Sequence, residues 1–497
     1  MKRALLSLLT LISLIPFLLS LWGSFGELQV QGELQLSQTN LLLTASNWRS
    51  PTAPSWQTSL LGQAPYLNAR QEYQTIVQEL EAYNTRIENQ LLAPLTLVEV
   101  DPQKQRLQEL RQQNQQTLQR LNLNLGLLEI QENLVPQALE RWQTLAEGPQ
   151  PSPAIAATSQ ILVQLWRNPP QAGTAGAAVL TANLQGWFQN QALKRFYQVA
   201  DQPLLLAALE QKEQSQAQQA LIKLAILSGL PLLGGCLGVL LLLGLLVQWL
   251  LKGEQALLAR HARLPWSVPW NWEIIWQVLL LGFLFLGQIV LPLIVSVLPW
   301  ELAQLDLQGK AFYVLWSYLI LALAGWGVLF FSLKPYFPLP ADWFRWQFNL
   351  SALGWGIGGY WVALPLVVLV SWLNQIFWQG QGGSNPLLSL ALQAQDRLVL
   401  FIFFFTATLL APLFEETLFR GFLLPSLTRY VSVPLAIGLS SLGFAVAHLN
   451  LSEILPLLML GLILGTVYTR SRNLLASVLV HGLWNSGTLI SLFLLGS

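Results

Sequence analysis

The sequence predicts an all-α fold: a polytopic membrane helix bundle of about eight core transmembrane helices, with an N-terminal anchor and an extracytoplasmic helical domain. Three observations support this prediction. The 497 residues are 53% hydrophobic and only 10% charged, whereas soluble domains are about 25% charged. Apolar segments close to the ~20 residues that a bilayer requires recur from residue 222 onward. Residues 23–220 are instead rich in glutamine and show helical periodicity.

Residues 1–22 are predicted to be the anchor. Lys2 and Arg3 precede the apolar segment LLSLLTLISLIPFLLSLWGSFG, which is typical of a signal peptide or of an uncleaved signal anchor. The segment is long for a signal peptide, and its flank SLWGSFGEL lacks a convincing small-x-small cleavage site, so we favour the anchor. The net charge of +1 does not indicate a nucleic-acid partner.

Residues 23–220 are predicted to form an extracytoplasmic α-helical domain. Amphipathic segments such as QEYQTIVQELEAYNTRIENQLL are separated by the Pro/Gly-rich breaks PTAPSW, EGPQPSPA and NPPQAGTAG. Gly126, Ala138 and Trp142 are spaced as in one tetratricopeptide-like unit, but no second copy follows at a fixed period. A small helical bundle is therefore favoured over a repeat array, and we expect it to recruit a protein partner or substrate.

The rest of the chain divides into additional transmembrane helices over 221–349 and a core over 350–497. Positive charges predict how these helices cross the membrane. Eleven Lys and Arg residues fall in one alternating set of loops, against two, Lys310 and Arg397, in the other. Because such residues collect on the cytosolic side, residues 23–220 and the C-terminus are expected outside the cytosol. The helices are expected at 222–251, 273–299, 311–333, 350–373, 397–426, 433–449, 454–469 and 474–495.

Three short polar patterns interrupt the apolar helices of the last hundred residues. EETLFR contains Glu415, Glu416 and Arg420; FAVAH ends in His448; HGLWN contains His481 and Asn485. An ionised side chain in a membrane helix costs roughly 2.5–3.5 kcal/mol even on lenient scales, so such residues usually serve a function. At 1.5 Å per residue, the three patterns lie at similar heights, ~13–21 Å above the cytosolic loops. We therefore expect them to converge near the middle of the membrane.

The spacing within these patterns suggests a division of roles. Glu416 and Arg420 stand i,i+4 with the acid first, the favourable order for a helical ion pair. That pair would leave Glu415, rotated by about 100° around the helix, available as a general base toward water. A second imidazole and an amide can stabilise a developing oxyanion. The set suits amide hydrolysis within the membrane.

The three patterns resemble those of the CAAX-protease and bacteriocin-processing (CPBP) family of intramembrane endopeptidases, which includes the type II CAAX prenyl protease. EETLFR, FAVAH and HGLWN match its motifs EExxxR, FxxxH and HxxxN in order, and the resemblance covers residues 350–495. It implies that Glu415 and His448 activate water, that His481 and Asn485 form the oxyanion hole, and that Glu416 and Arg420 support the site.

The resemblance leaves the metal requirement open. Glu415, His448 and His481 are ligand types that zinc accepts, and they are also a complete metal-free hydrolytic set, which we favour. The expected partners are a membrane protein or peptide substrate and the lipid bilayer of a bacterial-type cell membrane or internal membrane. Two other functions stay open: a non-catalytic scaffold or immunity-like protein of the same fold, and a proton-coupled transporter, because buried Glu and His also form proton relays.

Overall fold

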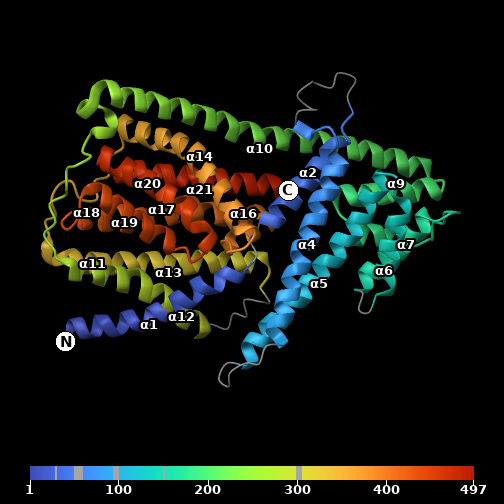
Figure 1. Cartoon of the computed structure of the whole chain (residues 1–497), viewed down its shortest axis with the longest axis horizontal. Coiled ribbons are helices and arrows are strands. Elements are labelled where there is room, and N and C mark those ends of the chain that lie inside the picture. The colour runs from blue at the N-terminus through green and yellow to red at the C-terminus, as the bar shows by residue number, and fades with distance from the viewer. Residues whose placement is uncertain are drawn as a thin grey trace. The chain divides into compact units, whose positions relative to one another are not determined.

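A computed structural model describes residues 1–27, 29, 31–49, 60–92, 100–148, 152–297 and 305–496 of the chain (Figure 1). The regular elements of these residues are helices, and eight of them are long and apolar enough to cross a membrane. The predicted all-α membrane fold is therefore confirmed. The chain divides into two compact units: Met1–Gln31 with Leu227–Ser497, and Gly32–Ile226. We call the first the membrane unit and the second the helical unit.

The eight candidate spans are the predicted anchor and seven of the eight predicted core helices. Their ends lie close to the predicted ones except in the first core helix, which was expected to begin at residue 222 but begins at Pro203, because it continues into the helical unit without a break. An additional apolar helix, α19 (Val433–Val446), is shorter than a full span. The predicted end of the second helix at residue 299 lies outside the described residues. The spans are Lys2–Gly23, Pro203–Gln255, Trp272–Ser296, Leu307–Tyr336, Leu350–Trp378, Arg397–Leu427, Leu451–Ser471 and Leu474–Gly496.

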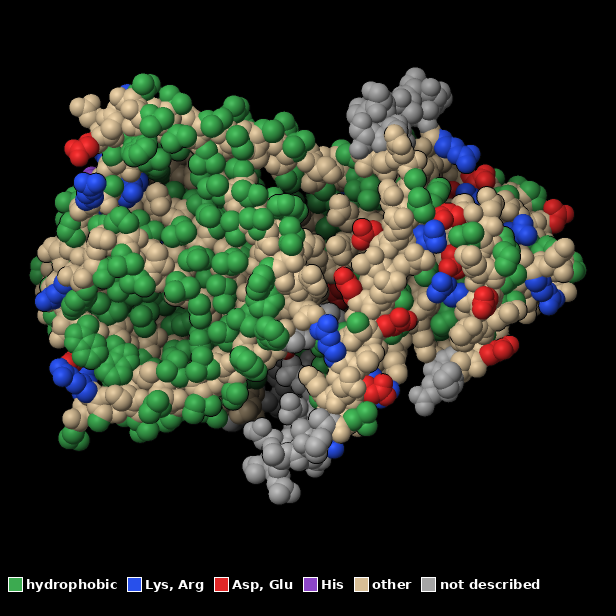
Figure 2. Space-filling view, in the orientation of Figure 1, with side chains coloured by type: hydrophobic (Ala, Val, Ile, Leu, Met, Phe, Trp, Pro, Cys, Tyr) green, Lys and Arg blue, Asp and Glu red, His purple; other side chains and the backbone are tan. Residues whose placement is uncertain are grey.

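The elements of the membrane unit are mostly α-helices, interrupted by π-helical and 3-10 segments. Hydrophobic side chains dominate the face of these helices that Figure 2 shows, as expected for a surface in contact with lipid. The α-helices are α1 (Lys2–Gly23), α10 (Pro203–Lys252, which it shares with the helical unit), α11 (Trp272–Leu279), α12 (Leu291–Val297), α13 (Leu307–Leu333), α14 (Leu350–Trp378), α15 (Pro386–Gln393), α16 (Arg397–Phe405), α17 (Ala411–Glu416), α18 (Leu424–Leu427), α19, α20 (Ile454–Ser471) and α21 (Leu474–Gly496).

The loops of the membrane unit form two hydrogen-bonded groups. In one group, Arg429 Nη1 donates to the carbonyl oxygen of Val268 at 3.2 Å, and Arg472 pairs with Asp342 at 3.3 Å. In the other, the amide of Leu451 donates to Ser24 Oγ at 3.2 Å. The grouping agrees with the predicted alternation of the loops; which group faces the cytosol stays a prediction.

One charge in the predicted loop set was misplaced. Arg420 was counted among the cytosolic loop charges, but it is fully buried inside a helical segment. Its burial is explained by its ion pair within that segment, described below. The predicted topology therefore rests on the other ten of the eleven charges.

The N-terminal helix α1 is part of the membrane unit. It packs against the π-helical segment η4 (Leu280–Val290). Arg3 forms an ion pair with Glu273 at the start of α11, and Thr10 accepts a hydrogen bond from Trp276 Nε1 at 2.9 Å. The 3-10 turn η1 (Ser24–Gly26) follows α1. The contacts of α1 are polar as well as apolar. Because polar contacts require particular partners, they fix the position of α1 within the membrane unit.

The helical unit is a set of antiparallel helices with its own core. Gly126 of α5 lies against the ring of Trp142 of α6, whose Nε1 donates to the carbonyl oxygen of Leu123 at 3.0 Å. Two of the residues that suggested a tetratricopeptide-like unit thus touch; the repeat assignment itself stays a prediction. The helices are α2 (Gln31–Ser46), α4 (Pro65–Leu92), α5 (Val100–Gln131), α6 (Val135–Glu147), α7 (Pro153–Trp166), α8 (Gly176–Asn183), α9 (Gly186–Val199) and the first part of α10.

Candidate active site

The two glutamates lie in a helix of irregular winding. Glu415 and Glu416 end the short α17, which is preceded by the π-helical segment η6 (Thr406–Leu410) and followed by the π-helical segment η7 (Thr417–Leu423). π-helical turns are rare and occur frequently at functional sites. Their wider winding changes the direction in which successive side chains leave the helix, so the placement of the two carboxylates does not follow from ideal α-helical spacing.

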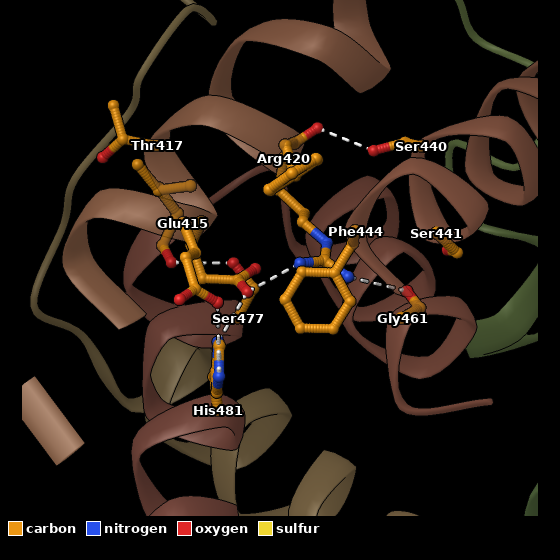
Figure 3. Close-up of polar contacts among 12 residues, drawn as sticks. Glu415, Thr417, Arg420, Ser440, Ser441, Phe444, Gly461, Ser477 and His481 are labelled. Carbon is orange, nitrogen blue, oxygen red and sulfur yellow. Dashed lines mark hydrogen bonds and ion pairs between the residues drawn. The ribbon is translucent and has the colours of Figure 1, made fainter. Parts of the chain in front are cut away.

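Glu416 and Arg420 form the ion pair that their i,i+4 spacing predicts (Figure 3). Arg420 Nη1 donates to Glu416 Oε1 at 2.8 Å, and both side chains are fully buried. Arg420 Nη2 donates to the carbonyl oxygen of Gly461 on α20 at 3.3 Å. The guanidinium lies 4.3 Å from the ring centroid of Phe444, in cation–π geometry. The pair therefore joins three helical segments at the centre of the bundle.

His481 joins both glutamates. Its Nδ1 lies 2.9 Å from Glu416 Oε1, and its Nε2 lies 3.9 Å from Glu415 Oε2. The carboxylate of Glu416 favours a proton on Nδ1, because the partner of one ring nitrogen sets the tautomer of the imidazole. In the neutral ring, Nε2 is then a hydrogen-bond acceptor that faces Glu415.

Glu415 is held on one side only. Tyr318 of α13 donates its hydroxyl to Glu415 Oε1 at 2.6 Å. Glu415 Oε2 is buried and has no hydrogen-bond partner among the described residues. Buried carboxylate oxygens normally have partners; Glu416 Oε2 and Arg420 Nε share this state, but Glu415 Oε2 is the one that faces His481 Nε2 across 3.9 Å.

His448 lies beyond the end of its helix rather than on it. We predicted a helix over 433–449, but α19 ends at Val446, and Leu449 takes a left-handed conformation (φ 64°) that is incompatible with helix continuation. His448 Nδ1 lies 2.9 Å from the carbonyl oxygen of Phe444. Among the described residues, His448 makes no ion pair or hydrogen bond with Glu415.

Phe444 links the separate parts of the site. Its ring makes edge contacts with His448 at 4.9 Å and with His481 at 5.6 Å between centroids, in addition to its contact with Arg420. Phe444 belongs to FAVAH, yet sequence reasoning gave it no role. Its place as the first residue of FAVAH was the signal in the sequence that could have indicated a role in the site.

Asn485 lies one turn after His481 on α21. Its Nδ2 donates to the carbonyl oxygen of Ala407 in η6 at 2.7 Å. Gly482 lies on the same side of α21, where an added Cβ would stand 2.7 Å from the carbonyl oxygen of Thr408. Asn485 therefore attaches α21 to the π-helical segment that precedes the glutamates, and a second N–H of its amide stays available for another acceptor.

Residues 397–487 match the family model described as type II CAAX prenyl endopeptidase, Rce1-like. The chain contains an Rce1-like domain. The match includes all six predicted site residues and covers less than a fifth of the chain. This family is a protease family, so the resemblance inferred from the three motifs is confirmed for this segment. No curated protein and no solved structure matches the chain.

The three side chains that zinc would require, Glu415, His448 and His481, are not brought together in the Rce1-like domain. Glu415 and His481 approach each other, but His448 is directed toward Phe444, and Nδ1 of His481 is engaged by Glu416. Across the described part of the chain, no three His, Cys, Asp or Glu side chains are placed to hold a metal ion.

Tyr318 was missed by the sequence analysis. It belongs to α13, outside the Rce1-like domain, and no motif includes it. The sequence contained no signal for it, because its contact with Glu415 depends on how α13 packs against α17.

Proposed function

We propose that this protein is an intramembrane endopeptidase that hydrolyses a peptide bond of a membrane-associated protein or peptide. The observation that carries the proposal is the buried Glu415 Oε2, which has no described partner and lies 3.9 Å from His481 Nε2. A separation above 3.5 Å between two polar atoms suits a bridging water. A water held between a carboxylate and an imidazole is positioned for activation as a nucleophile.

In the proposed reaction, Glu415 acts as the general base. Its Oε2 takes a proton from the water while the water oxygen forms a bond to the carbonyl carbon of the substrate. The resulting tetrahedral intermediate then collapses, the C–N bond breaks, and the proton passes from Glu415 to the leaving amine. Water and one peptide bond give a carboxylic acid and an amine, and Glu415 is regenerated as a carboxylate.

The other site residues orient the water and the substrate and stabilise the developing oxyanion. Glu416 keeps the proton of His481 on Nδ1, so that Nε2 accepts a hydrogen bond from the water. The geometry thus favours His481, rather than His448, as the immediate neighbour of Glu415. The free N–H of Asn485 is a candidate donor to the oxyanion. His448, reached through Phe444, is proposed to meet the substrate on the other side of the scissile bond.

The substrate class follows from the position of the site and from the family. The name of the matched family specifies prenylated CAAX proteins, so we propose a lipid-modified or membrane-embedded peptide that reaches the site from within the bilayer. We also propose that residues 23–220 lie outside the cytosol, on the strength of the loop charges, and that they select the substrate.

A proton-coupled transporter is the second candidate. The observation that favours it is the continuous series Tyr318, Glu415, His481, Glu416 and Arg420, in which titratable groups stand within hydrogen-bond or water-bridged distance. Such series also conduct protons. The two functions differ in what Glu415 does. In a protease, Glu415 is required for the cleavage that creates new protein N-termini. In a transporter, it is required for proton-dependent flux of a solute.

The test compares protein N-termini in membranes that contain the wild type or Glu415→Gln at matched expression. The proposal predicts cleavage products that are present with the wild type and lost with Glu415→Gln, because an amide cannot take the proton from water. Glu254→Gln, at an exposed loop residue, is the control and should keep the products. Identical N-termini with wild type and Glu415→Gln would favour the transporter or a non-catalytic scaffold.

A further inference from the structure

We propose that Tyr318 is a positioning residue for Glu415, whose hydroxyl holds Oε1 so that only Oε2 can take the proton of the attacking water. The inference rests on the proposed function of Glu415. It assigns part of the site to α13 (Leu307–Leu333), which lies outside the Rce1-like domain. The site would then be completed by a helix that the family model does not include.

The hydrogen bond has the geometry of a strong one. The separation of 2.6 Å between the Tyr318 hydroxyl and Glu415 Oε1 lies in the range of hydroxyl groups that donate to ionised carboxylates. The two oxygens of a carboxylate are equivalent, and rotation of the side chain exchanges their positions unless a hydrogen bond holds one of them. With Oε1 held by Tyr318, Oε2 is directed to His481 Nε2. Tyr318 thus selects which oxygen meets the water.

The packing of α13 brings Tyr318 to this position. Tyr318, Ala322 and Gly325 share one face of the helix, because residues four and seven apart lie on the same side. Gly325 faces Phe414, the residue before Glu415; a Cβ at Gly325 would stand 2.6 Å from that ring and 2.8 Å from the carbonyl oxygen of Gly282. Only a residue without a side chain permits this approach, and the approach places the Tyr318 hydroxyl within reach of Glu415.

The same contact has a chemical consequence. A hydrogen bond donated to a carboxylate stabilises its ionised form, which is the form that acts as a base. Without the hydroxyl, the carboxylate loses both its orientation and this stabilisation. A hydrogen bond to a charged group contributes enough that its loss is expected to lower the rate by about tenfold or more. Because the proposed role of Tyr318 is to hold Glu415, its loss should change substrate binding little.

The test uses the purified full-length protein in lipid nanodiscs and a quenched-fluorescent peptide that carries an S-farnesyl cysteine four residues from its C-terminus. For Tyr318→Phe we expect a fall in kcat of about tenfold or more with KM within about twofold. Tyr313→Phe is the matched control: Tyr313 is on the same helix and lines an apolar hollow with Leu291 and Trp316. It should behave as the wild type.

A second readout does not depend on cleavage. The infrared carboxylate stretching band of Glu415, assigned by its loss in Glu415→Gln, reports the hydrogen bonds that this carboxylate accepts. In Tyr318→Phe the band should shift in frequency, and in Tyr313→Phe it should not. If Phe at position 318 prevents folding, 3-fluorotyrosine keeps the shape and donates more strongly, and it should shift the band in the opposite direction.

The outcomes separate the two proposals. An unchanged band and an unchanged kcat in Tyr318→Phe, with cleavage still lost in Glu415→Gln, would overturn the role of Tyr318 and leave the endopeptidase intact. If the band shifts in Tyr318→Phe but the membranes contain no products that depend on Glu415, the contact is upheld and the proposed function is refuted. A fall in kcat of the same size in Tyr313→Phe would show a general effect of α13 and overturn the inference.

Discussion

At the scale of single residues, Glu416 Oε1 receives two hydrogen bonds, from Arg420 and from His481. One oxygen therefore fixes a guanidinium and an imidazole that come from different helices. In a buried site, an ion pair contributes little net stability, but the loss of one partner leaves an uncompensated charge. Arg420 thus pairs with Glu416 and holds its carboxylate where it contacts His481.

We predict that Arg420→Met destabilises the protein strongly. Breaking a buried pair costs about 3–5 kcal/mol, because Glu416 is left without its cation. The measurement is thermal unfolding in detergent. Thr417→Ala is the control, since Thr417 is directed away from the cluster (Figure 3) and should change the unfolding temperature little. The double variant Glu416→Gln/Arg420→Met should recover part of the loss; no recovery would contradict the account.

The sequence predicted the contacts that depend on spacing along one helix. The pair of Glu416 and Arg420 followed from i,i+4 spacing alone. The bond from His481 to Glu416 and that from Tyr318 to Glu415 connect residues 65 and 97 positions apart. No local pattern encodes them, because they arise from helix packing. His448 lies past the end of α19 and makes no described hydrogen bond to Glu415, so a joint action of the two on water, which the resemblance implied, stays a prediction.

At the scale of elements, glycine sets the distance between the helices that surround the site. Gly461 of α20 faces α19, where an added Cβ would stand 2.8 Å from the Cβ of Ser441 and 3.2 Å from Arg420 Nη2. The carbonyl oxygen of Gly461 also accepts a hydrogen bond from Arg420. The close approach of α19 and α20 is therefore coupled to the central ion pair.

We predict that Gly461→Val lowers cleavage activity and the unfolding temperature together, because α20 must move away from α19 and from Arg420. Gly438→Val on α19 is the matched control, since a Cβ there meets no atom within 4 Å. Activity toward the farnesylated peptide and thermal unfolding are measured for both variants. Equal effects at the two positions would mean that the loss reflects helix propensity rather than packing.

Helix positions were more predictable than helix geometry. Most of the predicted ends fall within a few residues of the observed ones, because twenty apolar residues in a row permit few other structures in a membrane. The π-helical segments η6 and η7 were not predictable. One of them, η6, packs against α21, and Asn485 donates to the carbonyl oxygen of its Ala407, a contact between residues 78 positions apart that no local pattern encodes.

At the scale of the whole molecule, the helical unit and the site belong to separate compact units. We predict that deletion of residues 32–226 leaves cleavage of the short farnesylated peptide intact, because the described site residues all belong to the membrane unit. Which membrane proteins are cut should change, as read from the N-termini in membranes. Loss of cleavage of the short peptide, in a variant that still unfolds cooperatively, would show that the helical unit is needed for the reaction itself.

The contacts of the N-terminal segment have a consequence for how the protein is made. Ser24 is bonded to Leu451, 427 residues later, and Gln29 to Gln381, 352 residues later. The ribosome delivers these partners last, and contacts between distant segments form slowly. The turn after His448 therefore cannot reach its final form until almost the whole chain has entered the membrane. The proposed endopeptidase also needs His481 and Asn485, which are made later still, so the proposal implies that it is inactive throughout its own synthesis, while unfinished proteins are present in the membrane.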